Sequence, residues 1–143
     1  GGGTWGTEEY ENFLEWDEVY NKNAGFARKL TMKFLPYMKK HKWGRVITIS
    51  SIFGKESGGR PWFVMAKAAE IALMKTLAGK YEEITFNTIA PGYIDVGKSF
   101  LEKPRFVGKP EDIASIVVFL CSDKAKFING ACIVVDGGES RSF

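Results

Sequence analysis

The run Phe63-Val64-Met65-Ala66-Lys67 places an aromatic ring and a lysine four residues apart, about one turn of a predicted helix. A lysine ammonium donates hydrogen bonds, and its positive charge favours the ionised form of a neighbouring phenol. Phe63 has the ring of a tyrosine without the hydroxyl, so it can neither give nor take a proton. The run therefore places a positive charge beside a ring that has no exchangeable proton.

The same run resembles the Tyr-x-x-x-Lys motif of the short-chain dehydrogenase/reductase family, with phenylalanine in place of the tyrosine. Each further match is weak by itself, but together they follow the family's order along almost the whole chain. They are Trp16-Asp17, Asn23 and Pro36 for the long central helix, residues 44–54 for the strand that carries the catalytic serine, residues 87–94 for the next strand and its cofactor-side loop, and residues 108–114, 119–123, 128–130 and 135–138 for the C-terminal end.

The resemblance implies catalytic roles for Ser51, Lys67 and Asn23. In the family the serine holds the substrate oxygen, the lysine binds the nicotinamide ribose and lowers the tyrosine pKa, and the asparagine supports a water chain to the lysine. Ser50 is the alternative to Ser51, because the loop to Phe63 is about one residue short of the family's. The competing interpretations are a strand-end turn for the serines, a surface lysine and an exposed helical asparagine.

The resemblance also implies NAD or NADP as the cofactor, with Pro91, Gly92 and Ile94 matching the loop beside the nicotinamide. Proline limits backbone freedom there, and glycine permits a close approach. Val96 stands where the family usually has threonine, which puts one hydroxyl contact to the cofactor in doubt. An ordinary Pro-Gly turn is the alternative. The choice between NAD and NADP is made in the family's N-terminal half, which this sequence does not contain.

The activity that the resemblance implies is NAD(P)-dependent interconversion of an alcohol and a carbonyl in a small-molecule substrate, by hydride transfer. With Phe63 in place of the tyrosine, the proton must come from water, from Ser51 or from Tyr93. General acid–base groups contribute about 10²–10⁴-fold, so a slow enzyme is expected rather than a dead one. Three interpretations remain open: an inactive variant, an enzyme with a relocated donor, and a catalytically silent homologue that binds a nucleotide or a partner subunit.

Hydrophobic spacing together with glycines and prolines predicts alternating helices and strands. Helices are expected over residues 8–42, with a kink at Pro36, over residues 62–81 and from Pro110 onward; strands are expected at 45–50, 84–89 and 131–135, and a loop at 54–61. This alternation is typical of a parallel sheet with helical crossovers. We therefore predict an α/β fold and a single domain over residues 1–143, the C-terminal portion of a Rossmann-like doubly wound sheet.

The glycine-rich turn that holds the cofactor pyrophosphate in the family has no match in this chain. Gly1-Gly2-Gly3 does not replace it, because no apolar strand precedes those residues. Three parallel strands normally lie inside a larger covered sheet, and the strand at 45–50 would keep an unpaired edge. We expect the full protein to be longer, with residues missing before position 1 and from the loops near Glu82 and Leu101. The 143-residue chain alone is expected to bind NADH and NADPH weakly.

Composition indicates no nucleic-acid or membrane partner. The net charge is +3 with both signs mixed along the chain, and neither an apolar run of membrane length nor a signal peptide is visible. We therefore expect a cytoplasmic protein. Cys121 and Cys132 match no metal or redox spacing and are expected to be two reduced, buried thiols. His41 is expected at the surface, so no metal site is predicted.

A homodimer or homotetramer is implied by the resemblance, because the family pairs its long central helix and its active-site helix with their copies. Ala66, Ala69, Leu73 and Leu77 recur at helical spacing, as an interface or a core face requires. Packing into the core of a single chain is the alternative explanation for this stripe.

Overall fold

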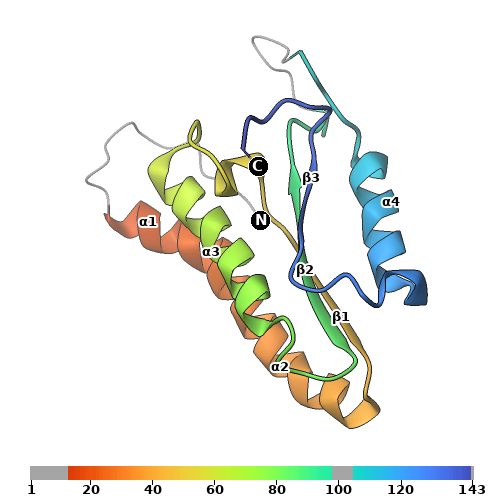
Figure 1. The fold of residues 1–143 in the computed structure, drawn as a ribbon. Coiled ribbons are helices and arrows are strands. Elements are labelled where there is room, and N and C mark those ends of the chain that lie inside the picture. Colours follow the sequence, from red (N-terminus) through yellow and green to blue (C-terminus); the bar gives the residue numbers. More distant parts are fainter. Residues whose placement is uncertain (1–12, 98–104, 143) are drawn as a thin grey trace.

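The computed structural model of the protein describes residues 13–97 and 105–142, which form a three-stranded parallel sheet with helices on both faces (Figure 1). The strands pair in the order β1-β2-β3. They are β1 (Gly44–Ile49), β2 (Ile84–Pro91) and β3 (Cys132–Val135). The helices are α1 (Phe13–Tyr20), α2 (Phe26–His41), α3 (Pro61–Leu77) and α4 (Pro110–Cys121), with short helical turns η1 (Asn21–Gly25), η2 (Ile52–Gly54) and η3 (Asp123–Ala125). The predicted α/β class and parallel sheet are confirmed.

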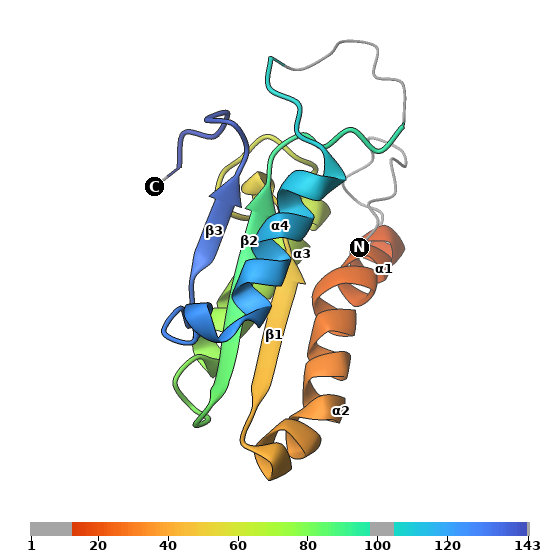
Figure 2. The same ribbon diagram turned by 90° about the vertical axis from the view of Figure 1, so that its right-hand side faces the viewer.

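Helices α2 and α3 cover one face of the sheet, and α4 covers the other (Figure 2). Side chains alternate between these faces along each strand: Val46 and Phe86 pack with α2 and α3, whereas Ile47 and Ile89 pack with α4. The crossovers through α3 and α4 step across the sheet in the same direction but on opposite faces. They therefore have opposite hands, and one of them departs from the right-handed rule.

Strand β2 is buried at every position, because β1 and β3 flank it and helices cover both of its faces. Two asparagines fix the connection that leads into β3. The Asn87 amide donates to the Ile128 carbonyl at 2.7 Å and accepts from the Ala131 N–H at 3.0 Å, while Asn129 accepts from the Phe86 N–H at 2.9 Å. The sheet is thus held by side chains as well as by its ladders.

The first helical region differs from the expectation in where it is irregular. The chain runs from α1 through the π-helical turn η1 into α2, and α2 continues past Pro36 to His41. The departure from α-helical hydrogen bonding at η1 was not predicted, and the kink at Pro36 stays a prediction. Residues 8–12 of the expected helix lie outside the described residues.

The expected helix over residues 62–81 is too long. Helix α3 ends at Leu77, because Ala78 leaves the helical conformation and Gly79 takes a φ of +75°, which favours glycine. The strand bounds shift by one or two residues: β1 begins at Gly44 and ends at Ile49, and β2 continues to Pro91. The predicted start of α4 at Pro110 is confirmed.

The prediction of two buried thiols is wrong. Cys121, at the end of α4, is exposed because α4 packs on the sheet by one side only, and Cys132 in β3 is half-buried. Burial raises the pKa of the Cys132 thiol, and the nearby Lys55 opposes that rise. Both cysteines are free. His41 is exposed, as predicted.

The stripe expected to form an interface on α3 belongs largely to the core of the single chain. Ala66 is completely buried against Val19 and Trp62, and Leu77 is buried in the cluster between the sheet and α2. Leu73 packs against the same cluster as Leu77. The prediction that this stripe forms a subunit interface is therefore wrong for Ala66 and Leu77, because both residues are buried within a single chain.

Within the described residues β1 has an unpaired edge, as predicted, and this edge opens into a groove of about 540 Å³ beside α2. The apolar residues Phe26, Leu30 and Phe34 of α2 line the groove and are 40–56% exposed. Glu70 of α3 lies at the same groove. None of the helices within residues 13–97 and 105–142 is long and apolar enough to cross a membrane.

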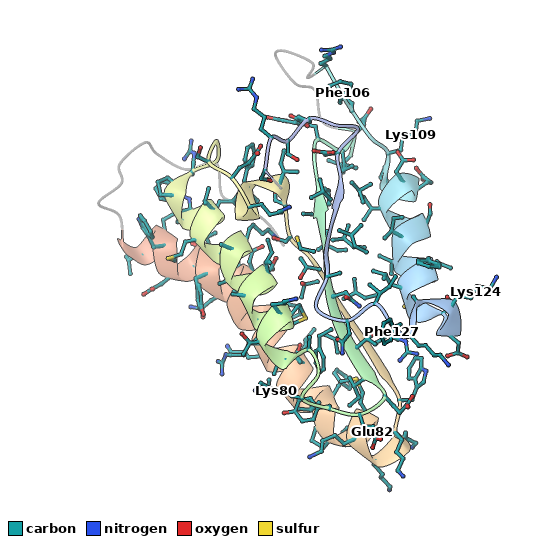
Figure 3. The ribbon with its side chains drawn as sticks, viewed as in Figure 1. Lys80, Glu82, Phe106, Lys109, Lys124 and Phe127 are labelled. Carbon is teal, nitrogen blue, oxygen red and sulfur yellow. The ribbon has the colours of Figure 1, made fainter. Side chains whose placement is uncertain are left out.

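All three strands end at one end of the sheet, since the sheet is parallel. The segment before α4, with Phe106 and Lys109, lies at that end, whereas Lys80 and Glu82 lie at the opposite end (Figure 3). The side chains that follow the strands are therefore gathered at the end where Phe106 lies.

Candidate active site

The two serines after β1 have different surroundings. Ser50 is buried, its N–H continues the sheet ladder to Ile89, and its hydroxyl donates to the Lys67 carbonyl at 2.8 Å. Ser51 is half-buried and caps η2, with its hydroxyl oxygen accepting from the Phe53 N–H at 3.2 Å. Ser51 is therefore the less buried of the two serines, and its catalytic role stays a prediction.

A glycine lets the serine turn lie directly on α3. A Cβ at Gly54 would come within 2.8 Å of the Ser50 hydroxyl oxygen and 2.9 Å of the Lys67 carbonyl carbon. Any larger residue there would push η2 away from the helix. The distance between the serine turn and Lys67 is thus set by backbone packing.

Lys67 is not a surface lysine, since only 4% of the residue is exposed. Its ammonium donates to the Ile49 carbonyl at 3.0 Å and to Glu70 Oε2 at 3.1 Å. The ammonium also lies 5.7 Å from the centre of the Phe63 ring. The site lysine therefore lies at the carboxyl end of β1, facing the position where the family has its tyrosine.

Glu70 is a site residue that the sequence analysis missed. It is 5% exposed, and burial raises its pKa above the ordinary value of 4.5, against the opposing effect of the Lys67 charge and hydrogen bond. One signal was available in the sequence: Glu70 is the only acidic residue of α3, and it stands three positions after Lys67 among alanines. A carboxylate at that spacing lies on the same side of a helix as the lysine.

Asn23 lies in η1, a π-helical turn of the kind often found at functional sites. It is 2% exposed, so the alternative of an exposed helical residue is wrong. Its amide nitrogen donates to the Val19 carbonyl at 2.8 Å. Because η1 packs against α3, the fold brings Asn23 to the helix that carries Lys67.

Phe63 is half-buried and packs against the cluster formed by Val19, Trp62 and Ala66. Its ring is held between α1 and the Lys67 ammonium, in the distance range of a cation–π contact. Position 63 therefore faces the site, and only its hydroxyl is missing.

The segment after β2 is placed by contacts with the C-terminal part of the chain. Pro91 ends β2 and is buried, and Ile94 is held by a bridge to Gly108. A Cβ at Gly92 would lie 2.8 Å from the Asp136 Cβ. The protein's own packing therefore requires the glycine. Val96 is 60% exposed and is not packed into the site.

The fold thus gathers Ser51, Phe63, Lys67 and Asn23 on elements packed around α3, with Pro91 and Gly92 at the end of the adjacent strand. Their placement is a finding, and their catalytic and cofactor-binding roles stay predictions. Within the part of the chain that the structure describes, no group of histidine, cysteine and acidic residues could hold a metal ion.

Comparison with known proteins places almost the whole chain in one group. A family model described as enoyl-(acyl carrier protein) reductase matches residues 9–140. The chain is 33% identical over 141 residues to the 3-oxoacyl-[acyl-carrier-protein] reductase FabG of Thermotoga maritima, covering 87% of this chain and 56% of that protein. It is 36% identical over 141 residues to the acetoacetyl-CoA reductase of Shinella zoogloeoides, covering 87% of this chain and 58% of that protein. The chain thus spans a little over half the length of these relatives.

Solved structures show the same fold. A mutant 4-hydroxyisoleucine dehydrogenase complexed with NADH and succinate matches with a TM-score of 0.85 at 27% identity, covering 92% of this chain and 61% of that one. The acetoin dehydrogenase YohF of Salmonella typhimurium matches with a TM-score of 0.87 at 24% identity, covering 100% of this chain and 63% of that one, and shows the fold alone. Both likenesses confirm the Rossmann-like arrangement predicted from the sequence.

Proposed function

The chain belongs to the short-chain dehydrogenase/reductase family, and we propose that the protein interconverts an alcohol and a carbonyl with NAD or NADP. The observation that carries this proposal is the placement of Lys67. A lysine buried at the carboxyl end of a parallel strand, next to the serine turn, is positioned to bind a ligand at that end of the sheet.

The described residues fit the nicotinamide end of such a cofactor. The Lys67 ammonium has three protons, and two are used by the Ile49 carbonyl and Glu70, so one remains for a ribose hydroxyl. Pro91 ends the adjacent strand β2 and Ile94 follows it, where the family places the nicotinamide. When bound, the cofactor supplies or accepts the hydride.

The chain's own residues would orient the substrate and supply its proton. Ser51 would hold the substrate oxygen through its hydroxyl, and Lys67 would fix the ribose. Asn23 would support water near the lysine from η1. Because Phe63 has no hydroxyl, the proton would come from water, from Ser51 or from Tyr93, the half-buried residue after the Pro-Gly turn.

The second candidate is a catalytically silent homologue that binds a nucleotide or a partner subunit. Phe63 favours it directly, because the residue faces Lys67 but cannot exchange a proton. Glu70 adds to this support, because it binds the Lys67 ammonium and neutralises its charge within the protein.

Phe63→Tyr in the full-length protein separates the two candidates. Turnover is measured with NADH and NADPH on a panel of carbonyl compounds that begins with acetoacetyl-CoA, the compound in the name of one relative. For an oxidoreductase we expect a slow parent and a rise in kcat of about 10²-fold, because the phenol restores a proton donor. Phe127→Tyr, at a position 99% exposed, is the matched control and should change nothing. No gain on any substrate, with cofactor binding retained in calorimetry, would favour the silent homologue.

We also propose a homo-oligomer whose interface is formed by α2 and α3. Because part of the stripe expected at this interface is buried, the interface on α3 would use residues that remain at the surface. Ala72 is exposed, unlike Ala66 and Leu77. Ala72→Glu should reduce the mass measured by light scattering to that of a monomer, because a two-fold interface meets the new charge twice. A monomeric parent would refute the oligomer, and an oligomer that survives the change would refute this interface.

The cytoplasmic location and the absence of nucleic-acid and membrane partners remain predictions from the sequence.

A further inference from the structure

The Lys67–Glu70 pair is unusual for its burial. Charged pairs at i,i+3 on a helix are common on protein surfaces, where water screens them. Here the side chains are 5% and 6% exposed, and the ammonium lies 3.1 Å from the carboxylate oxygen. A buried ion pair interacts more strongly than a surface pair, because little water screens it. The Glu70 carboxylate therefore interacts strongly with the charge of the Lys67 ammonium.

The direction of that influence follows from the surroundings of the ammonium. Its neighbours are the Ile49 carbonyl, the Glu70 carboxylate and, at 5.7 Å, the ring of Phe63. A cation lowers the pKa of a phenol by favouring the phenolate. A carboxylate bound to that cation acts in the opposite sense, because it repels a phenolate. Glu70 thus opposes the effect that Lys67 would have on a hydroxyl at position 63.

The other charged side chains near the Lys67–Glu70 pair either form ion pairs of their own or do not line the groove at Glu70. Among the elements packed against α3, α1 carries Glu15, Asp17 and Glu18, η1 carries Lys22 and β1 carries Arg45, whereas η2 and β2 carry no charged residue. Helix α2 also packs against α3 and carries basic residues, none of which lines the groove at Glu70: Arg28, Lys29, Lys33, Lys39, Lys40 and His41. Lys22 and Arg45 line the same groove as Glu70, but Lys22 pairs with Glu18 and Arg45 with Asp123. Lys67 is therefore the cation that Glu70 binds among the described residues.

We propose that Glu70 is a positioning residue that holds the Lys67 ammonium in a buried ion pair and withdraws its charge from position 63. Two features of the site therefore act in the same sense: Phe63 carries no hydroxyl, and the ammonium that faces it is bound to Glu70. The inference concerns the charge at the site. The experiment that tests it needs neither cofactor nor turnover. The charge inference can therefore fail while the proposed activity stands, and the proposed activity can fail while the charge inference stands.

The test introduces a phenol as a reporter and then removes the carboxylate. Full-length Phe63→Tyr and Phe63→Tyr/Glu70→Gln are labelled with ¹³Cζ-tyrosine, and the signal absent from the parent is followed by NMR over a pH series. With Glu70 present, the introduced phenol should titrate near the ordinary value of about 10. With glutamine, its pKa should fall by about one unit or more, a tenfold rise in its acid dissociation constant. Phe63→Tyr/Glu82→Gln is the matched control, because Glu82 is exposed at the opposite end of the sheet.

Equal phenol pKa values with and without Glu70 would overturn the proposal, as would a fall of the same size in the Glu82→Gln control. If the variant with Glu70→Gln does not fold, the ion pair can be tested in the parent protein instead. The ¹⁵Nζ signal of Lys67, assigned by its loss in Lys67→Met, should shift in the acid range as Glu70 takes up a proton. Burial raises the pKa of Glu70, so this transition should lie above 4.5. A Lys67 signal without that transition would overturn the proposal.

Discussion

Lys67→Met should make the stability of the protein depend strongly on pH, because it leaves Glu70 buried without its cation. Methionine matches the length of the lysine stem and packs without a charge. The carboxyl group then has two options in the folded state. It can stay ionised in an apolar environment, or it can take up a proton and become neutral.

The cheaper option sets the size of the effect. Leaving one member of a buried ion pair charged costs about 3–5 kcal/mol. Protonating Glu70 at pH 7 instead costs about 1.36 kcal/mol for each pH unit above its ordinary pKa of 4.5, or about 3.4 kcal/mol. The loss at pH 7 should therefore not exceed about 3.4 kcal/mol, which corresponds to roughly 10 °C in Tm for a domain of this size.

The sign of the pH dependence follows from the direction of the pKa shift. Burial raises the pKa of Glu70, and Lys67 opposes the rise, so removing Lys67 moves the folded-state pKa further above the unfolded value. The folded state then holds the proton more tightly than the unfolded chain. The stability that this proton contributes is fully present below about pH 4.5 and is lost as the pH rises through the folded-state pKa.

Urea unfolding of the full-length protein at several pH values between 4.5 and 7 measures the effect. Relative to the parent, Lys67→Met should be close to neutral at pH 4.5 and least stable at pH 7. Lys75→Met, which changes an exposed lysine of the same helix, controls for the substitution. Lys67→Met/Glu70→Leu should abolish the extra pH dependence, because no carboxyl group remains. The same pH dependence in the parent and in Lys67→Met would refute the reasoning.

Three further changes test the neighbourhood of the site. Ser51→Ala should lower kcat in the turnover assay with little change in Tm, whereas Ser50→Ala should lose about 1 kcal/mol of stability with its buried hydrogen bond, and the reverse pattern would exchange their roles. Asn87→Ala should cost about 2–4 kcal/mol in urea unfolding, because two backbone groups of the β3 connection lose their partner; a loss below 1 kcal/mol would contradict this. Gly92→Ala should cost about 1–3 kcal/mol, because the added Cβ would lie 2.8 Å from that of Asp136, and an unchanged melting curve would count against that packing.

The elements that the sequence predicted well are those marked by local signals. Helix α4 begins at Pro110 because proline suits the first turn and Asp112 accepts the Lys109 N–H at 2.7 Å. The strand predicted at 84–89 lies within β2, which begins at Ile84 as predicted and ends at Pro91, just before Gly92. In these cases the residues that fix the boundary are neighbours in the chain.

The elements predicted less well depend on distant contacts. The residues after Leu77 are compatible with a helix up to Gly79, so the pattern did not show where α3 would stop. The π-helical turn at Asn21–Gly25 has no residue type that marks it, because one extra residue in a helical turn is tolerated only where packing with α3 supports it. Cys121 was expected in the core because free cysteines usually are, but α4 buries only one of its sides.

At the site, the sequence by itself determined the chemistry that is present and absent: a serine pair, a lysine, an asparagine, and a phenylalanine without a hydroxyl. The tertiary structure decided how these groups are divided. Packing of η2 on α3 buries Ser50 and leaves Ser51 accessible, and the removal of water around Lys67 turns Glu70 from an ordinary helical carboxylate into its bound counter-ion. Spacing along a helix can bring two charges together, but only the surrounding fold determines whether water separates and screens them.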